Sequence, residues 1–392
     1  MKIALVALPQ PEDTPIAPPL PLAYAAAMLE QQRHIVRIYD LALCDALSLA
    51  EALAPLRTFR PHIVAIAATD PRATTAAKAA LHGCGATVLH LGAALRTFTP
   101  DRTIASVFWR LDKQSAAEDD QNLIFGTLLA LDDELDALPF PARHLLPLEQ
   151  YPLRTPTGEL QTTLLAGQVA GAGEVIPRKP ALVIAELHSI AREHGIRHAL
   201  FLDPPLTHDL AWLREMLYDL AAADLGIGWE GAVRHQRLSP DLLGLFRHAG
   251  CEALCFRFKA ADVLDSRDER AALSGLVAYA HELGMWVRAH IELEPPYGAI
   301  SALVDMSATF GLDDVRFSAQ QRATAHEQAE RPEPADVAEM ARLRYRSRRR
   351  RQLFIQRFGP QLGPMLWRAG QAGLLGRAWQ YYADGAAERA PV

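Results

Sequence analysis

The sequence predicts an α/β protein with a doubly wound, Rossmann-type first domain, a partial (β/α)6 barrel and a helical C-terminal tail. Short β-branched or apolar runs alternate with Ala- and Leu-rich helical stretches up to about residue 320, the pattern of parallel sheets with crossover helices. A proline-rich segment interrupts this alternation. We therefore expect a first domain at 1–130, a linker at 131–161, a barrel at 162–320 and an arginine-rich tail at 321–392.

Composition narrows the functional classes. The chain has 392 residues, of which 50% are hydrophobic and 22% charged, as in globular proteins with room for two domains. A net charge of -6 gives no overall attraction to nucleic acid or an anionic membrane. The four cysteines are too scattered for a disulfide framework, and no apolar run has the length of a membrane span. We expect a cytoplasmic protein.

The first domain should contain four parallel strands. The strand candidates are Lys2–Leu8, His34–Tyr39, Ile63–Ala67 and Thr87–Leu91. Helices are expected at Leu22–Gln32, at Ala46–Phe59 with a break at Pro55, and at Ala73–Leu81. Ligands of such sheets bind beyond the carboxyl ends of the strands, which here are Pro9–Pro21, Ala68–Pro71 and Gly92–Pro100.

The second part repeats a strand–helix unit. Its strand candidates are Thr162–Ala166, His198–Leu202, Leu225–Trp229, Ala253–Phe258, Trp286–Ile291 and Asp314–Phe317. Helices are expected at Ala181–His194, Asp209–Ala223, Pro240–His248, Arg267–Leu283 and Gly298–Phe310. The run Thr162–Arg178 predicts a strand, a glycine-rich loop and the start of a helix, and the loops after the strands carry the active-site residues of a barrel. This run nevertheless contains no Cys, His, Ser or Lys.

Three stretches of the first domain resemble one family. They are PPLPLAYAAAMLE from Pro18, PHIVAIAATDP from Pro61, and GATVLHLGAALRTFTP from Gly85. Together they are similar to the cobalamin-binding domain of cobalamin-dependent radical S-adenosylmethionine (SAM) enzymes. The family's Gly-Gly turn reads Gly92-Ala93 here, and its later Gly-Glu-Gly-Glu turn is missing. The resemblance implies that cobalamin would be approached by Pro18, Pro19, Leu20, Ala68, Thr69, Asp70, Gly92, Ala93 and Ala94.

The resemblance continues through the linker into the barrel, over roughly residues 1–320. The linker LDDELDALPFPARH, from Leu131, resembles the segment that joins the two domains of the family. FLDPPLTHD at Phe201–Asp209 and the turn Ala249-Gly250-Cys251 resemble stretches of its barrel.

The cluster motif of the family is absent. Radical cleavage of SAM needs three thiolates in C-x3-C-x2-C spacing, which would fall in Gly167–Val175. That stretch has no cysteine, and Cys251-x3-Cys255 lacks a third thiolate. Where the family has Gly-Ile-Glu-Ser-Gly, this chain has Arg257-Phe258-Lys259-Ala260-Ala261. Arginine in place of glycine fills space, and lysine in place of glutamate reverses the charge. The resemblance thus implies a pseudoenzyme without an iron–sulfur cluster, which binds a corrinoid or an anionic ligand or assists an active relative.

Two other functional classes stay open. Polar groups at the strand ends would suit non-radical acid–base chemistry, with Asp203, His290 and Glu292 as candidate catalytic residues. His290 and Glu292 are two apart on a strand and so share a face, but we predict no metal site. The same groups would more often form a salt-bridge network in a disused barrel. A pure protein-interaction scaffold is the third class.

The tail is rich in arginine. The expected helix Asp336–Phe358 carries Arg342, Arg344, Arg346 and Arg348–Arg351. Such a run contacts phosphates in some proteins but is more often a solvated helix packed on an acidic surface, so nucleic acid is not expected as a partner. The amphipathic stretch Met365–Tyr382 would cover the barrel or a protein partner.

Overall fold

The computed structural model describes residues 1–9, 16–44, 48–67, 71–91, 135–169, 175–202, 205–294, 300–319 and 334–371. The chain divides into two compact units. The first comprises Met1–Val233 and Asp241–Ala253, and the second Arg234–Pro240 and Leu254–Val392. Within the described residues, no helix is both long and apolar enough to cross a membrane.

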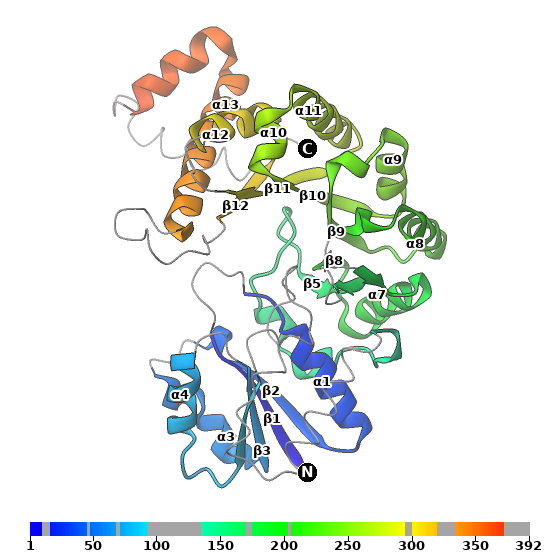
Figure 1. The fold of residues 1–392 in the computed structure, drawn as a ribbon, viewed down its shortest axis with the longest axis vertical. Helices are drawn as coiled ribbons and strands as arrows, with labels where there is room; N and C mark the ends of the chain where they lie inside the picture. Colours follow the sequence, from blue (N-terminus) through cyan, green and yellow to red (C-terminus); the bar gives the residue numbers. More distant parts are fainter. Residues whose placement is uncertain are drawn as a thin grey trace. The chain divides into compact units, whose positions relative to one another are not determined.

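The first unit opens with a four-stranded parallel sheet in the order β2-β1-β3-β4 (Figure 1). The strands are β1 Lys2–Ala7, β2 Ile35–Asp40, β3 Ile63–Ala67 and β4 Thr87–Leu91. Its helices are α1 Leu20–Gln31, α2 Leu49–Ala52, α3 Ala54–Phe59 and α4 Pro71–Ala80. The predicted break at Pro55 is confirmed, because α2 ends at Ala52 and Pro55 lies in the first turn of α3.

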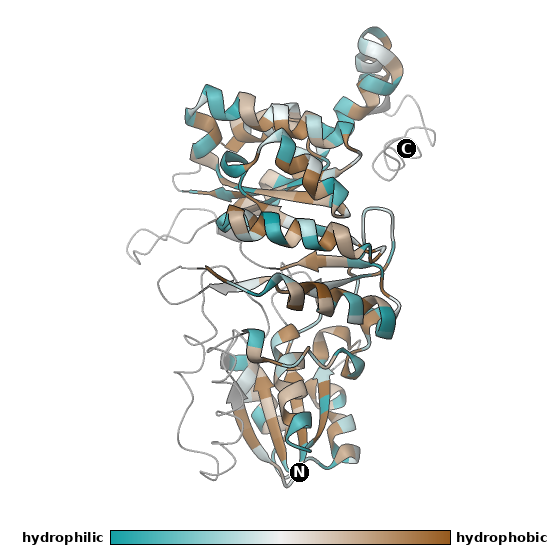
Figure 2. Cartoon of the chain, turned by 90° about the vertical axis from the view of Figure 1, so that its right-hand side faces the viewer, coloured by the Kyte–Doolittle hydropathy of each residue, from teal (hydrophilic) through white to brown (hydrophobic). Residues whose placement is uncertain are grey.

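Both faces of this sheet are covered by helices. Ile3, Leu5 and Ala7 pack with α1, whereas Ala4, Val6 and Leu8 pack with residues of α2 to α4. Strands buried on both faces read as continuous apolar runs, and Figure 2 shows these strands mostly in brown.

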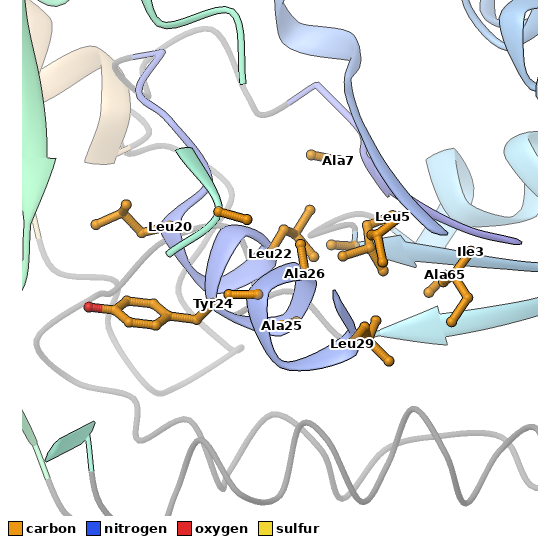
Figure 3. Packing of buried hydrophobic residues seen from close by; sticks show 14 of the residues in the cluster. Ile3, Leu5, Ala7, Leu20, Leu22, Tyr24, Ala25, Ala26, Leu29 and Ala65 are labelled. Carbon is orange, nitrogen blue, oxygen red and sulfur yellow. The ribbon is translucent and has the colours of Figure 1, made fainter. Parts of the chain in front are cut away.

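Helix α1 is buried on nearly every side, from Leu20 to Leu29. Figure 3 shows Leu22, Ala26 and Leu29 toward the strands, while the Tyr24 hydroxyl points away from them. Other residues therefore cover the Tyr24 side of the helix. They include Leu138, Ala142 and Leu165, which belong to the same apolar cluster.

The segment after residue 134 packs against the first sheet through three short 3-10 turns, Leu135–Ala137, Arg143–Leu145 and Leu148–Gln150. The Ala142 amide donates to the Ala23 carbonyl over 2.9 Å. The Tyr151 hydroxyl donates to Asp40 Oδ2 over 3.0 Å. These bonds fix Arg143 beside α1.

A half-barrel sheet follows, in the order β12-β11-β10-β9-β8-β5. Its strands are β5 Gln161–Leu164, β8 His198–Phe201, β9 Gly228–Val233, β10 Cys251–Lys259, β11 Trp286–Leu293 and β12 Asp314–Ala319. The helices are α7 Pro180–His194, α8 Leu210–Ala223, α9 Pro240–His248, α10 Ala260–Asp265, α11 Arg267–Glu282 and α12 Ile300–Thr309. The spatial order follows the chain order, so each β/α unit adds one strand, as the sequence predicts. Helix α10 was not predicted.

The sequence predicts a glycine-rich loop between β5 and α7, whereas the structure has a β-hairpin there. Strands β6 Gly167–Val169 and β7 Val175–Pro177 form an antiparallel pair before α7. Gly167 allows the close approach, because a Cβ there would lie 2.8 Å from the Ile176 carbonyl oxygen. Residues 170–174, between the two strands, lie outside the described part of the chain.

The last described element of the second unit is α13, Pro334–Gln371, which is interrupted at Gly359 with φ 80°. Its buried residues include Val337, Ala341 and Tyr345, and the Tyr345 hydroxyl donates to the Leu312 carbonyl over 2.7 Å. Arg348 contacts Asp305 over 2.9 Å. The arginine-rich helix thus packs with one face and presents arginines to acidic neighbours.

Candidate functional site

The predicted cofactor-binding residues fall in two groups. Pro18, Pro19 and Leu20 lie at the start of α1 and are buried. Ala68, Thr69, Asp70, Gly92, Ala93 and Ala94, together with the catalytic candidate Asp203, lie outside the described residues.

The described strand ends of the first sheet carry small residues. Strands β1 and β3 end in register at Ala7 and Ala67, two small residues. Leu20 is 1% exposed and its side chain belongs to the core, so only its backbone could contact a ligand. Small side chains and backbone at the carboxyl edge of a parallel sheet are compatible with a corrin ring.

A buried cluster of ion pairs in the first unit centres on Glu186 of α7. Glu186 is fully buried, and Arg143 and Arg178 are 3% and 2% exposed. Arg143 Nη2 lies 2.7 Å from Glu186 Oε1, and Arg178 Nη1 lies 2.6 Å from Glu186 Oε2. Two guanidinium groups share one carboxylate, so the cluster carries a net positive charge away from solvent.

Backbone carbonyls stabilise that charge. Arg143 donates to the Thr163 carbonyl over 2.7 Å, and Arg178 donates to the Leu165 carbonyl over 2.9 Å. The Arg178 amide also donates to the Ala166 carbonyl over 2.7 Å. Because a buried charge is costly unless it is paired and hydrogen-bonded, these contacts bind the base of the β6–β7 hairpin tightly.

Tyr24 completes the cluster from α1. Its hydroxyl donates to Glu186 Oε2 and accepts from Arg178 Nη1, both over 3.3 Å. Burial, followed by the neighbouring Glu186 carboxylate, raises the pKa of Tyr24 far above its ordinary value. The phenol therefore stays neutral and ties α1 to α7.

Sequence reasoning did not predict this cluster. The available signal was the position of Glu186, three residues after Val183 and four before Ile190, on the buried stripe of α7. An acidic residue on such a stripe needs a cationic partner, but the pattern does not say which arginine supplies it.

Cys251 of β10 is a poor metal ligand. Cys251 is fully buried and its thiol donates to the Ala253 carbonyl over 3.3 Å. Burial, followed by Glu230, raises the pKa of Cys251 well above its ordinary value, which disfavours the thiolate that binds metals. No group of three His, Cys, Asp or Glu residues in the described part of the chain is arranged to hold a metal ion.

The catalytic candidates His290 and Glu292 lie on β11 in the second unit. They alternate with Ala289, Ile291 and Leu293, which are buried, so the two share the opposite face of the strand. His290 Nε2 lies 2.8 Å from the Ser318 hydroxyl oxygen. Burial, followed by Arg257 and Arg316, lowers the pKa of His290 to about 4. An imidazole with that pKa is a weak general base at neutral pH.

Solved structures share this architecture. The radical SAM methyltransferase TsrM from Kitasatospora setae, with cobalamin and a [4Fe-4S] cluster bound, aligns with a TM-score of 0.54 at 14% identity, over 82% of this chain and 75% of its own. The cobalamin-dependent SAM radical enzyme OxsB, with aqua-cobalamin bound, also gives 0.54, at 12% identity, over 83% of this chain. This chain has the fold of the cobalamin-dependent radical SAM enzymes.

Within that fold the chain spans 54% of OxsB, so about half of the longer enzyme has no counterpart here. Comparison with protein-family models and with curated proteins finds no match to the sequence. The likeness to cobalamin-dependent radical SAM enzymes is therefore one of fold, and the ligands must be argued from this chain's own residues.

Proposed function

We propose that the protein is a diverged homologue of the cobalamin-dependent radical SAM enzymes that binds a corrinoid and does not form an iron–sulfur cluster. The observation that carries the proposal is the anchored hairpin. A segment without thiolates, Gly167–Pro177, follows the first strand of the half-barrel sheet and is tied at its base by Arg143 and Arg178.

The remaining cysteines of the chain argue against a cluster at another place. A site-differentiated [4Fe-4S] cluster needs three thiolates, and the sequence holds Cys44, Cys84, Cys251 and Cys255. Cys251 and Cys255 lie four residues apart on β10 and offer two thiols at most. Without the cluster there is no site to bind and reduce SAM in the way the radical reaction requires.

The corrinoid would be held by the carboxyl edge of the first sheet. Pro18, Pro19 and Leu20 would contribute backbone at the start of α1, with Ala68–Asp70 and Gly92–Ala94 as the further contacts that the sequence predicts. A bound corrinoid would supply a cobalt centre for radical or alkyl-transfer chemistry. The chain's own part is to orient the ring against small side chains.

Corrinoid binding is tested by absorbance after incubation with hydroxocobalamin and gel filtration. The wild-type protein should retain the visible bands of the corrinoid. Ala93→Trp, which fills the predicted edge, should lose them, while Ala79→Trp on the exposed side of α4 should keep them. If the corrinoid co-elutes with neither the wild type nor Ala79→Trp, corrinoid binding is ruled out.

Cluster loss is tested separately by anaerobic reconstitution with iron and sulfide. We expect no stable absorbance near 400 nm, roughly where thiolate-ligated clusters absorb, and no cleavage of SAM by the reconstituted protein. A stable cluster in the wild-type protein would refute the proposal. Its survival in the double substitution Cys251→Ala and Cys255→Ala would show that other residues hold it.

A second role, as an accessory protein, is favoured by the surface of α13. Leu343, Leu362 and Met365 are 57%, 61% and 62% exposed, so this helix offers large apolar side chains to a partner. We propose that such a partner docks on this helix. The acid–base alternative has less support, because His290 is a poor base and Asp203 lies outside the described residues.

A further inference from the structure

Helix α13 has an inner face and an outer face. The inner face packs against α12 and β12, and its buried residues are Val337, Ala341 and Tyr345. The outer face carries a line of residues spaced alternately by three and four positions, which we call the outer seam. Its members are Met340, Leu343, Ser347, Arg350 and Phe354. Met340 is 39% and Leu343 57% exposed, so the N-terminal half of the outer seam lies open to solvent.

The C-terminal half of the outer seam is covered by a helical segment of the same chain, which follows the interruption at Gly359. Phe354 is 4% exposed, and its ring centroid lies 5.5 Å from that of Trp367, edge to face. Gly363 allows a close approach, because a Cβ there would lie 2.7 Å from the Ile355 Cα. The outer seam therefore already packs against one helix, and a second helix would cover its open half in the same way.

Arginines flank the open half of the outer seam. When the seam is counted as heptad positions a and d, Arg346 takes position g and Arg351 position e, where paired helices exchange ion pairs. Arg350 lies in the seam itself. All three are exposed and form no hydrogen bond or ion pair within the described part of the chain. Arg348 differs, because Asp305 engages it over 2.9 Å. The outer seam is thus apolar at its start and positively charged along its flanks.

We propose that the outer seam of α13 binds an acidic amphipathic helix of another protein. Such a helix would pack its apolar side chains on Met340 and Leu343, which would bury both. Its glutamate or aspartate side chains, at the positions beside its own apolar seam, would pair with Arg346 and Arg351. The inference rests on the accessory role proposed above and adds the chemistry of the partner.

Other occupants fit the outer seam less well. The phosphates of a nucleic acid would bind the arginines but leave Met340 and Leu343 in water. A helix that lies on a membrane keeps its charges on the side opposite its apolar residues, whereas Arg350 lies within the seam. In a parallel pair of two copies of α13, Arg350 would face Arg350 and Arg346 would face Arg351, and these like charges repel.

The experiment measures the binding of two synthetic helical peptides to the full chain by fluorescence anisotropy at physiological salt. Each peptide spans about three heptads with leucine at positions a and d. The acidic peptide has glutamate at positions e and g, and the basic peptide has lysine there. The wild-type chain should bind the acidic peptide about tenfold more tightly than the basic one. The double substitution Arg346→Glu and Arg351→Glu should reverse this preference.

Matched variants separate the outer seam from general effects of charge and hydrophobicity. Arg192→Glu with Arg214→Glu makes the same change of charge at exposed positions of α7 and α8, and should change the Kd less than about twofold. Leu343→Ala should raise the Kd about tenfold, because the apolar contact is lost. Tyr218→Ala, which removes a side chain that is 60% exposed on α8, should leave the Kd unchanged. Circular dichroism and thermal unfolding check that each variant is folded.

The inference is overturned if the acidic peptide does not bind, if the wild-type chain binds both peptides equally, or if both double substitutions weaken binding equally. Tighter binding of single-stranded RNA or of vesicles that contain phosphatidylserine would identify a different occupant and overturn it too. So would self-association of the chain that Leu343→Ala removes.

Corrinoid uptake is measured in the same preparation by absorbance. Absent peptide binding with intact corrinoid uptake refutes this inference alone. Peptide binding without corrinoid uptake refutes corrinoid binding alone.

Discussion

Glu186 shows how much a single buried carboxylate can determine in this chain. It holds two arginines that come from different segments, and each arginine in turn binds a carbonyl at the end of β5 or the start of the hairpin. The geometry of the whole junction between β5, the hairpin and α7 depends on that one side chain.

Removing this carboxylate should be severely destabilising. Glu186→Ala leaves two guanidinium groups buried without a counter-charge, at a cost of about 3–5 kcal/mol in the free energy of unfolding. The matched control is Glu193→Ala on the exposed side of the same helix, which should cost less than about 0.5 kcal/mol. Urea denaturation of both variants measures the difference, and similar midpoints would contradict the role given to Glu186.

His290 should make stability depend on pH. Its pKa is about 4 in the folded chain against an ordinary 6.5, so the unfolded chain takes up a proton at a higher pH than the folded chain does. The free energy of unfolding is therefore unaffected above pH 6.5 and falls as the pH drops from 6.5 toward 4, by up to about 3 kcal/mol.

Denaturation at several pH values checks this expectation. His290→Gln should flatten the dependence in that window, whereas the exposed His188→Gln should leave it unchanged. An unchanged slope in His290→Gln would mean that other groups cause the acid sensitivity.

At the level of elements, close approaches between backbone segments restrict some positions to glycine. Gly250 has φ 88°, and a Cβ there would lie 2.8 Å from the Ile227 carbonyl oxygen. Gly195 has φ 67° with open space around it. Gly195→Ala should cost about 1 kcal/mol from backbone strain alone, and Gly250→Ala should cost about 1–3 kcal/mol more from the clash. Equal costs in urea denaturation would show that the β10 turn can relax.

The strands and most helices could be predicted from the sequence because their patterns are local. β3 is an uninterrupted run of buried residues, and α9 has its predicted bounds, Pro240–His248. The hairpin escaped prediction because strands of three residues are too short to show a periodicity. Helix α10 escaped because six residues are too few for a helical pattern.

The site was less predictable than the fold, for a physical reason. Tyr24 and Glu186 are 162 positions apart, and their contact exists only because α1 and α7 pack together. Local patterns indicate that a buried charge needs a partner, but the partner is a property of tertiary structure. The predicted pair of His290 and Glu292 shares a strand face, as its spacing indicates, whereas its catalytic role remains a prediction.

At the scale of the whole molecule, a bound corrinoid should protect the first unit and not the second. A ligand that binds only the folded state stabilises its own site, by about 2.7 kcal/mol at a concentration of 100 times the Kd. With hydroxocobalamin, hydrogen exchange should therefore slow in β1, β3 and α1 and stay unchanged in β11 and β12. Equal protection of both groups of strands would contradict a corrinoid site on the first sheet.

The division of the chain into units also has a consequence for its synthesis. The first unit is not complete at Val233, because it includes Asp241–Ala253. The Trp229 indole donates to the Ala249 carbonyl over 2.7 Å, and its ring packs against Phe246. During synthesis, the first unit therefore cannot complete its fold until Asp241–Ala253 have been made. These residues follow Arg234–Pro240, the first segment of the second unit. A ribosome that pauses after Trp229 has left the exit tunnel, but before Phe246 and Ala249 have left it, would hold Trp229 without its partners and expose the nascent chain to aggregation.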